Sequence, residues 1–245
     1  MTGTLINIVT VLIGTSLGIA VGNRLPERWR QTVLDGLGLA TLGYGVLSLV
    51  DAMSNQANVP VKFIVVLLSM LFGGIAGEAL DLDGALNRTG AWLEARFARS
   101  GSAEQTARFV RGFVAASVVF CVGPMTILGS IRDGLTGDYS LLAIKSVLDG
   151  FASLAFAASL GIGVGFSVLT ILVLQGGLSL MAGVLQSAFT PAMLAVLSAT
   201  GAVIILGIGF SLLEIKRVRV ANFLPALVLA LIAAAVLGGA GVSGF

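Results

Sequence analysis

Residues 121–150, which read CVGPMTILGSIRDGLTGDYSLLAIKSVLDG, decide the fold because they place charge inside apolar sequence. A membrane span needs about 20 apolar residues, and the runs at 109–130 and 141–160 meet that length. The glycine-rich segment between them is predicted to be a loop. Lys145 and Asp149 nevertheless lie inside the second run. Ionisable groups in hydrocarbon are costly, so they mark a candidate functional site.

The composition places the whole chain in the membrane class, with the lipid bilayer as its surroundings. Of its 245 residues, 57% are hydrophobic and only 11% are charged, which is too little charge to cover a soluble domain. The net charge of +2 gives no reason to expect nucleic acid as a partner. The chain has no histidine, and its single Cys121 lies within a span, so no intramolecular disulfide forms. We expect no metal, no cofactor and no enzyme activity, since no nucleophile motif is present.

Span length divides the chain into eight predicted membrane helices, so the expected fold class is all-α, a polytopic transmembrane helix bundle. The apolar tract 140–187 is too long for one crossing, and we divide it at the glycines of 161–165. The spans are 4–22, 33–50, 60–79, 109–130, 141–160, 164–187, 191–213 and 222–242.

The basic residues give an orientation to these spans. Eleven of the fourteen lie in three groups, at 24–30, 88–111 and 216–219. With eight spans, all three groups fall on one side of the membrane. The positive-inside rule makes that side the cytoplasm, so both termini are predicted to lie outside it.

Residues 82–105 are predicted to form a helix and loop lying in the cytoplasmic interface. Leu82, Leu86, Leu93 and Phe97 fall at helical spacing, and arginines occupy other positions of the same turns. Ser102 followed by Gln105 is typical of a capping box at the start of the fourth span. The segment is either a connector that lies against lipid or a surface for a partner.

An internal repeat relates the two ends of the chain. A shift of 164 residues brings Leu42-Gly43-Tyr44-Gly45 onto Leu206-Gly207-Ile208-Gly209. Residues 1–81 and 164–242 then become two three-helix repeats that flank the central hairpin 109–160. Because the shift covers five spans, the copies have opposite orientation in the membrane. Inverted repeats of this kind are typical of secondary transporters.

The central hairpin carries most of the candidate site. Lys145 and Asp149 are four residues apart, share one helix face and can pair. Such a pair is either structural or functional, and we favour function because buried pairs contribute little net stability. Pro124 should kink the fourth span and free backbone carbonyls. The candidate residues for binding a substrate or ion are Asn7, Gly123, Pro124, Thr126, Ser130, Asp133, Lys145, Ser146, Asp149 and Gln175.

Several of these positions also have structural interpretations. Asn7 either lines a cavity or is a packed amide, and Gln175 precedes two glycines that indicate either a broken helix or a tight helix crossing. Glu78, Asp138 and Asn222 are candidates for coupling or gating. For Glu78 we favour solvation or pairing with a basic loop residue, and Asn222 can simply begin a helix.

Four segments of the chain together resemble a known family. They are 120–123, 127–130, 133–138 and 145–150, and residues 3–7, 77–78 and 222–226 fit the same pattern. The pattern is similar to that of the YqgA/YdfK-type bacterial membrane proteins, domain of unknown function 554. The resemblance covers nearly the whole chain. It implies a protein of the bacterial inner membrane, in a family of unassigned function that is listed among candidate transporters, and it supplies no substrate.

Two functions are consistent with these observations. The first is a secondary transporter or channel-like carrier of a small ion or solute, with protons or cations coupled through Asp149. The alternative is a membrane sensor or scaffold that acts through the interfacial helix. The glycine-rich spans would also allow a homodimer.

Overall fold

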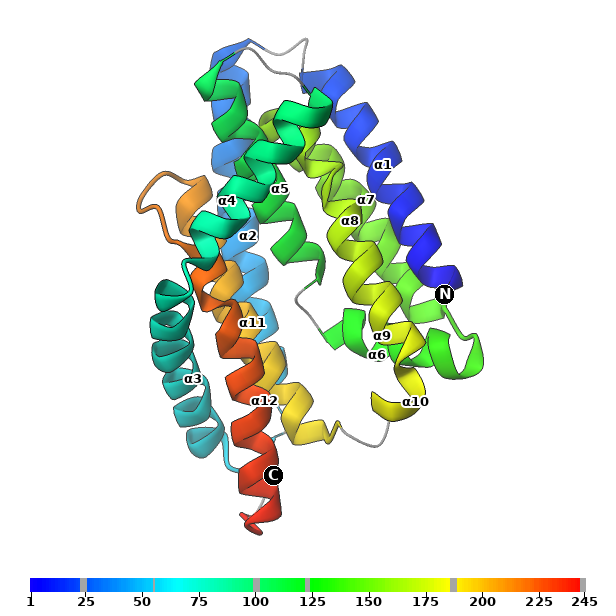
Figure 1. Cartoon of the computed structure of the whole chain (residues 1–245), viewed down its shortest axis with the longest axis vertical. Helices are drawn as coiled ribbons and strands as arrows, with labels where there is room; N and C mark the ends of the chain where they lie inside the picture. Colours follow the sequence, from blue (N-terminus) through cyan, green and yellow to red (C-terminus); the bar gives the residue numbers. More distant parts are fainter. Residues whose placement is uncertain (23–25, 55, 99–101, 122–123, 186–188, 243–245) are drawn as a thin grey trace. The chain divides into compact units, whose positions relative to one another are not determined.

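A computed structural model describes residues 1–22, 26–54, 56–98, 102–121, 124–185 and 189–242. Helices and short loops make up this part of the chain, and no strand occurs in it. The helices, in chain order, are α1 (Thr2–Gly22), α2 (Glu27–Met53), α3 (Val59–Ala79), α4 (Leu82–Leu93), η1 (Glu94–Ala98), α5 (Ala103–Cys121), α6 (Pro124–Thr136), α7 (Ser140–Leu160), η2 (Gly161–Val164), α8 (Ser167–Ile171), η3 (Leu172–Gly176), α9 (Gly177–Leu180), α10 (Ala182–Leu185), α11 (Pro191–Leu212), η4 (Val220–Phe223) and α12 (Leu224–Gly239) (Figure 1).

The predicted all-α membrane fold is confirmed. Six helices of the described chain are long and apolar enough to cross a membrane: α1, α2, α3, α7, α11 and α12. The fourth predicted span is the pair α5 and α6, bent by 63° at a short break. The sixth is an apolar stretch, Ser167–Leu180, whose middle turn is the π-helical η3. The count of eight spans therefore stays a prediction.

The central hairpin differs from its prediction in one respect. The segment after residue 130, predicted to be a loop, is helical as far as Thr136. The reason is packing, because a Cβ at Gly134 would lie 2.7 Å from Ala182, against α10. The turn itself is limited to residues 137–139, where Gly137 has a φ of 72° that favours glycine.

The chain divides into two compact units that do not follow the boundaries of the predicted repeats. Unit 1 comprises residues 1–37, 86–121 and 125–186. Unit 2 comprises residues 38–85, 122–124 and 187–245.

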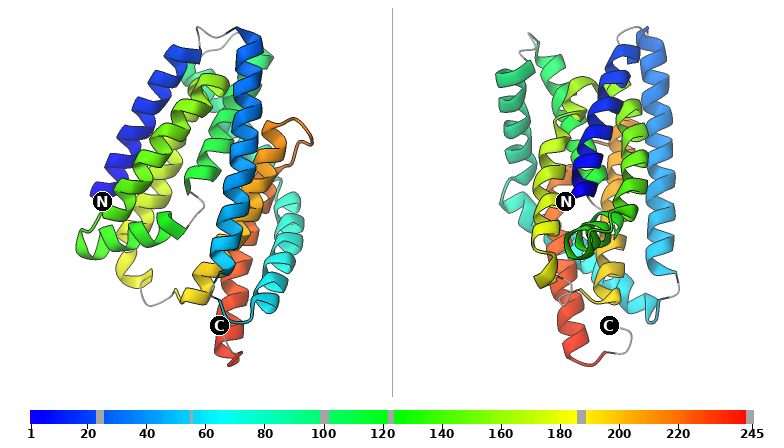
Figure 2. Two further views of the ribbon diagram at one scale, coloured as in Figure 1. Left: turned by 180° about the vertical axis from the view of Figure 1, so that it is seen from behind. Right: turned by 90° about the vertical axis from the view of Figure 1, so that its right-hand side faces the viewer.

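In unit 1, helices α1 and α7 lie side by side and run parallel (Figure 2). Gly3 of α1 packs on Leu142, while Gly18 packs on Leu154 and Ala157. Residue numbers therefore increase in the same direction along both helices. A Cβ at Gly18 would lie 2.9 Å from the Cβ of Ala157. The small residues of α1 let the two helices approach closely.

The amphipathic segment of unit 1 packs onto the start of α5. Leu93, at the end of α4, forms a buried cluster with Phe109, Val110 and Phe113. The predicted cap is present, since the backbone N–H of Gln105 donates to Ser102 Oγ at 3.2 Å. Trp92 remains 62% exposed, as expected for a side chain that faces lipid or the interface.

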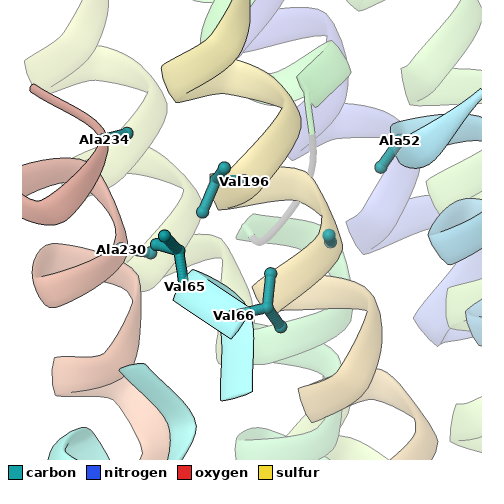
Figure 3. Packing of buried hydrophobic residues seen from close by; sticks show 7 residues of the cluster. Ala52, Val65, Val66, Val196, Ala230 and Ala234 are labelled. Atoms are coloured by element: carbon teal, nitrogen blue, oxygen red, sulfur yellow. The ribbon is translucent and has the colours of Figure 1, made fainter. Parts of the chain in front are cut away.

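Unit 2 is built on α3, α11, α12 and most of α2. Its buried core joins all four helices through seven small apolar side chains (Figure 3). These are Ala52, Val65, Val66, Val196, Ala199, Ala230 and Ala234.

The contact between α2 and α11 has the pattern of a two-fold axis. A Cβ at Gly209 would lie 2.7 Å from Leu42, and a Cβ at Gly45 would lie 2.7 Å from Leu206. The proposed repeat equates Leu42 with Leu206 and Gly45 with Gly209. Each equivalent pair therefore exchanges the same leucine-on-glycine contact, as expected of an isologous interface. The helices are antiparallel, and the inverted repeat stays a prediction.

Candidate functional site

The candidate site is built around the Lys145–Asp149 pair of α7. Both residues lie on the buried face of the helix, one turn apart, and they are 6% and 7% exposed. Lys145 Nζ donates to Asp149 Oδ2, so the two charges form an ion pair inside unit 1. The predicted pairing is thus present in the structure.

Asn7 of α1 and Gln175 of η3 extend this pair into a polar cluster. Asn7 Nδ2 donates to Asp149 Oδ2 at 3.0 Å and to Gln175 Oε1 at 3.3 Å. Both amide side chains are fully buried. The parallel packing of α1 on α7 brings Asn7 to Asp149, and the π-helical turn of η3 carries Gln175 to Asn7. Four residues from three segments that are distant in sequence thereby meet.

The charge on Asp149 fixes the orientation of both amides. A carboxylate only accepts hydrogen bonds, so Asn7 must turn its NH₂ group toward Asp149. The second N–H of that group then requires the carbonyl of Gln175. This arrangement leaves Asn7 Oδ1 and Gln175 Nε2 buried without a hydrogen-bond partner in the protein. One acceptor and one donor are therefore open beside the ion pair.

The end of α5 forms another wall of the cluster. Lys145 Nζ lies 6.0 Å from the centre of the Phe120 ring, at the outer limit of a cation–π contact. Thr126 of α6 donates to the backbone carbonyl of Phe120 at 3.2 Å and so binds one of the carbonyls at the end of α5. Gly123 lies outside the described residues. Pro124 is placed as the first residue of α6.

Asp133 is buried on α6, at the end of unit 1 nearest the start of α1. Its Oδ2 accepts from the backbone N–H of Gly3 at 3.0 Å and forms an ion pair with the amino group of Met1. Its Oδ1 has no partner in the protein. Ser130 lies nearly one turn earlier on α6 and is also fully buried without a partner.

The hydroxyl of Ser146, which the sequence assigned to the site, and that of Ser153 have helix-packing contacts instead. Ser146 donates to the carbonyl of Leu142 in its own helix at 2.6 Å. Ser153 donates to the carbonyl of Val11 at 3.2 Å and so ties α7 to α1.

Glu78 and Asn222 lie in unit 2, in a polar cluster separate from the Lys145–Asp149 pair. Glu78 Oε1 pairs with Arg219 at 2.5 Å, and Asn222 Nδ2 donates to Glu78 Oε2 at 2.7 Å. Asn222 Oδ1 accepts from the backbone N–H of Asp83 at 2.7 Å. Together these contacts fasten the end of α3 to the start of α4 and to η4. The pairing of Glu78 with a basic loop residue is the structural interpretation favoured from the sequence.

Asp138 is exposed in the turn before α7 and caps that helix. Its Oδ1 accepts from the backbone N–H of Ser140 at 3.1 Å. The hydrogen bonds from Ser140 hold the pKa of Asp138 below its usual range, because they favour the charged carboxylate.

Sequence reasoning missed five buried hydroxyls of unit 1. The side chains without a hydrogen-bond partner are those of Thr4, Thr15, Ser159, Ser167 and Ser179. A signal was available, because Ser167, Gln175 and Ser179 repeat at multiples of four residues. That spacing puts polar side chains along one helix face.

Comparison with known proteins gives the same assignment along nearly the entire chain. The family described as "Protein of unknown function (DUF554)" matches residues 2–235. The Escherichia coli (strain K12) protein described as "Uncharacterized protein YqgA" is 37% identical over 229 residues, which cover 94% of each chain. The Bacillus subtilis (strain 168) protein described as "Uncharacterized membrane protein YdfK" is 28% identical over 229 residues, 94% of this chain and 93% of that one. No solved structure matches. The chain is therefore a multi-pass membrane protein of the DUF554 family.

Proposed function

We propose that this protein is a secondary transporter or channel-like carrier of a small ion or solute in the bacterial inner membrane. The observation that carries the proposal is the buried cluster of Asn7, Lys145, Asp149 and Gln175, of which the first three lie in membrane-length helices. Intramembrane ionisable residues that face a bundle interior are typical of ion and substrate pathways. In this proposal Asp149 exchanges the coupling proton or cation, and Lys145 is its counter-charge.

A purely structural role explains the cluster less well. Helices α1 and α7 already pack through the glycines of α1 along much of their length. A buried ion pair adds little net stability compared with apolar side chains of similar size. The cluster also leaves an amide oxygen and an amide nitrogen open, and each buried polar atom without a partner costs about 1–3 kcal/mol. Binding of a ligand offsets this cost.

The proposal is tested by reconstituting the full chain in liposomes and screening flux under imposed ion and pH gradients. Asp149→Asn keeps the size of the side chain and removes its charge, so we expect at least a tenfold loss of flux. Asp51→Asn is the matched control, because Asp51 is exposed on α2. A cooperative thermal transition would show that each variant is folded, even where the midpoint of Asp149→Asn is lowered because Lys145 has lost its counter-charge. Wild-type flux in a folded Asp149→Asn variant would contradict the proposal, and absence of wild-type flux under every gradient would favour the sensor or scaffold role.

A further inference from the structure

Among the residues that the structure describes, the buried side-chain nitrogen and oxygen atoms without hydrogen-bond partners lie in unit 1. Within the part of the chain that the structure describes, nine side chains bury a nitrogen or oxygen that has no hydrogen-bond partner: Thr4, Asn7, Thr15, Ser130, Asp133, Ser159, Ser167, Gln175 and Ser179. Other buried hydroxyls have partners. Ser198 and Thr200 in unit 2 and Ser146 in unit 1 each donate to the carbonyl four residues earlier in their own helix. The open atoms are therefore not a general property of buried serine and threonine.

These atoms lie at three successive levels along the axis of unit 1, counted from the start of α1. At the first level, Ser179 lies on the turn of α9 that packs on Gly134, the neighbour of Asp133. Asp133 accepts a hydrogen bond from the backbone N–H of Gly3, the neighbour of Thr4. At the second level, Asn7 meets Gln175.

At the third level, Thr15 packs on Gly165, close to Ser167. Ser159 follows Ala158, which packs on Gly22 at the far end of α1. From Thr4 to Gly22 the helix rises about 27 Å, close to the roughly 30 Å thickness of the hydrocarbon core.

We propose that unit 1 encloses a hydrated proton pathway that runs from Asp133 past the Lys145–Asp149 pair to Thr15, Ser167 and Ser159. This inference rests on the proposed transport function and names its coupling ion. Buried water typically makes about three hydrogen bonds to polar groups that would otherwise have no partner. Hydroxyls and amides without partners lie at every level, and they provide polar groups of this kind.

The charges around Asp149 favour a proton over a metal cation. The ionisable side chains beside it are Lys145 on its own helix and Cys121 at the end of α5. Helix α1 and the stretch Ser167–Leu180 contain no ionisable side chain, and Asp133 lies at the outer level. A metal ion on Asp149 would lie against the ammonium group of Lys145, which repels it. A proton instead neutralises the carboxylate by forming one O–H bond, and its release to water on the other side breaks the same bond.

The first test measures whether water reaches the pathway. In the full chain carrying Cys121→Ala, cysteines are introduced one at a time as Thr4→Cys, Ser167→Cys and Ser179→Cys. A methanethiosulfonate reagent, which reacts with thiols in water, is added to the reconstituted protein. Control variants are Val9→Cys, which is 53% exposed on the lipid-facing side of α1, and Thr200→Cys, buried in unit 2. We expect at least tenfold faster labelling of the three pathway cysteines than of both controls.

The second test identifies the ion. Liposomes that contain the wild-type protein and a pH-sensitive dye receive a pH gradient in sodium-free buffer. We expect proton flux that falls at least tenfold in Asp149→Asn and is unchanged in Asp51→Asn. Wild-type flux that requires sodium would overturn the proton assignment and leave transport standing. Pathway cysteines labelled no faster than Thr200→Cys would overturn the pathway, even where Asp149→Asn abolishes flux. A wild-type protein that carries nothing would overturn the proposed function itself.

Discussion

At the scale of single residues, the central feature is the buried Lys145–Asp149 ion pair, which contacts the amide of Asn7 and, through it, the amide of Gln175. Asp149 accepts hydrogen bonds from Lys145 and Asn7 on the same oxygen. The two charges compensate each other, so the pair is tolerated only while both partners are present. Loss of one partner leaves a buried charge without its counter-charge.

Lys145→Met should therefore destabilise the protein by about 3–5 kcal/mol, because it strands the Asp149 carboxylate in an apolar interior. The double variant Lys145→Met/Asp149→Asn should recover most of that loss. Unfolding of the detergent-solubilised full chain by denaturant, followed by tryptophan fluorescence, measures both. A double variant as unstable as Lys145→Met would show that Lys145 acts through packing and not through its charge.

At the scale of helices, small residues decide which helices touch. Gly18 of α1 lies so close to α7 that an added Cβ would lie 2.9 Å from Ala157. Gly36 of α2 has nothing within 4 Å of an added Cβ. The two glycines therefore differ in their surroundings: Gly18 is in close contact with a neighbouring helix, and Gly36 is not.

Gly18→Leu should separate α1 from α7 and cost about 1–3 kcal/mol or more, as expected for overpacking a close contact. Gly36→Ala should instead be neutral or stabilising by about 1 kcal/mol, since alanine is the better helix former. Thermal unfolding of the two variants is the measurement. Equal destabilisation by both would mean that α1 and α7 do not pack as closely as described.

The symmetric contact of unit 2 makes its own prediction at this scale. Gly45→Leu and Gly209→Leu should destabilise the protein to similar extents, because each glycine receives an equivalent leucine from the opposite helix. Gly43→Leu serves as the control, since nothing lies within 4 Å of its added Cβ. A loss confined to Gly45 or to Gly209 would argue against the two-fold relation between the helices.

At the scale of the whole molecule, helix directions within each unit agree with eight crossings. In unit 1, α1 and α7 are parallel, which requires an odd number of crossings between them. Helices α2 and α3 and the bent pair α5–α6 supply three. In unit 2, α2 and α11 are antiparallel, which requires an even number. That number is reached when the interrupted stretch Ser167–Leu180 also crosses.

Eight crossings and the positive-inside rule place the carboxyl terminus outside the cytoplasm. A carboxyl-terminal alkaline phosphatase fusion should therefore be active in cells, and a fusion to a fluorescent protein that folds only in the cytoplasm should stay dark. A fusion at Lys216, where a basic group separates α11 from α12, should give the reverse pattern. A bright carboxyl-terminal fusion would contradict the predicted topology.

The sequence by itself determined the membrane class, the helical fold, the Lys145–Asp149 pairing and the positions of the glycines in α1. Each of these depends on local properties: the length of an apolar run, the four-residue spacing of a helix face, and the absence of a Cβ. Asn7 and Gln175 were also identifiable as polar residues within apolar spans. The structural interpretations of both residues remained open, because the local sequence around a residue does not show which residues of other helices contact it.

Only the tertiary structure decided which polar residues meet. It joined Asn7, Asp149 and Gln175 through the parallel contact of α1 with α7 and the π-helical turn of η3. It placed Glu78 and Asn222 in a separate polar cluster of unit 2. Among the described residues, it showed that the buried hydroxyls without hydrogen-bond partners lie in unit 1. The physical reason is that hydrogen bonding between helices depends on their register and direction. Both are set by packing between segments more than a hundred residues apart, and not by the local sequence of either one.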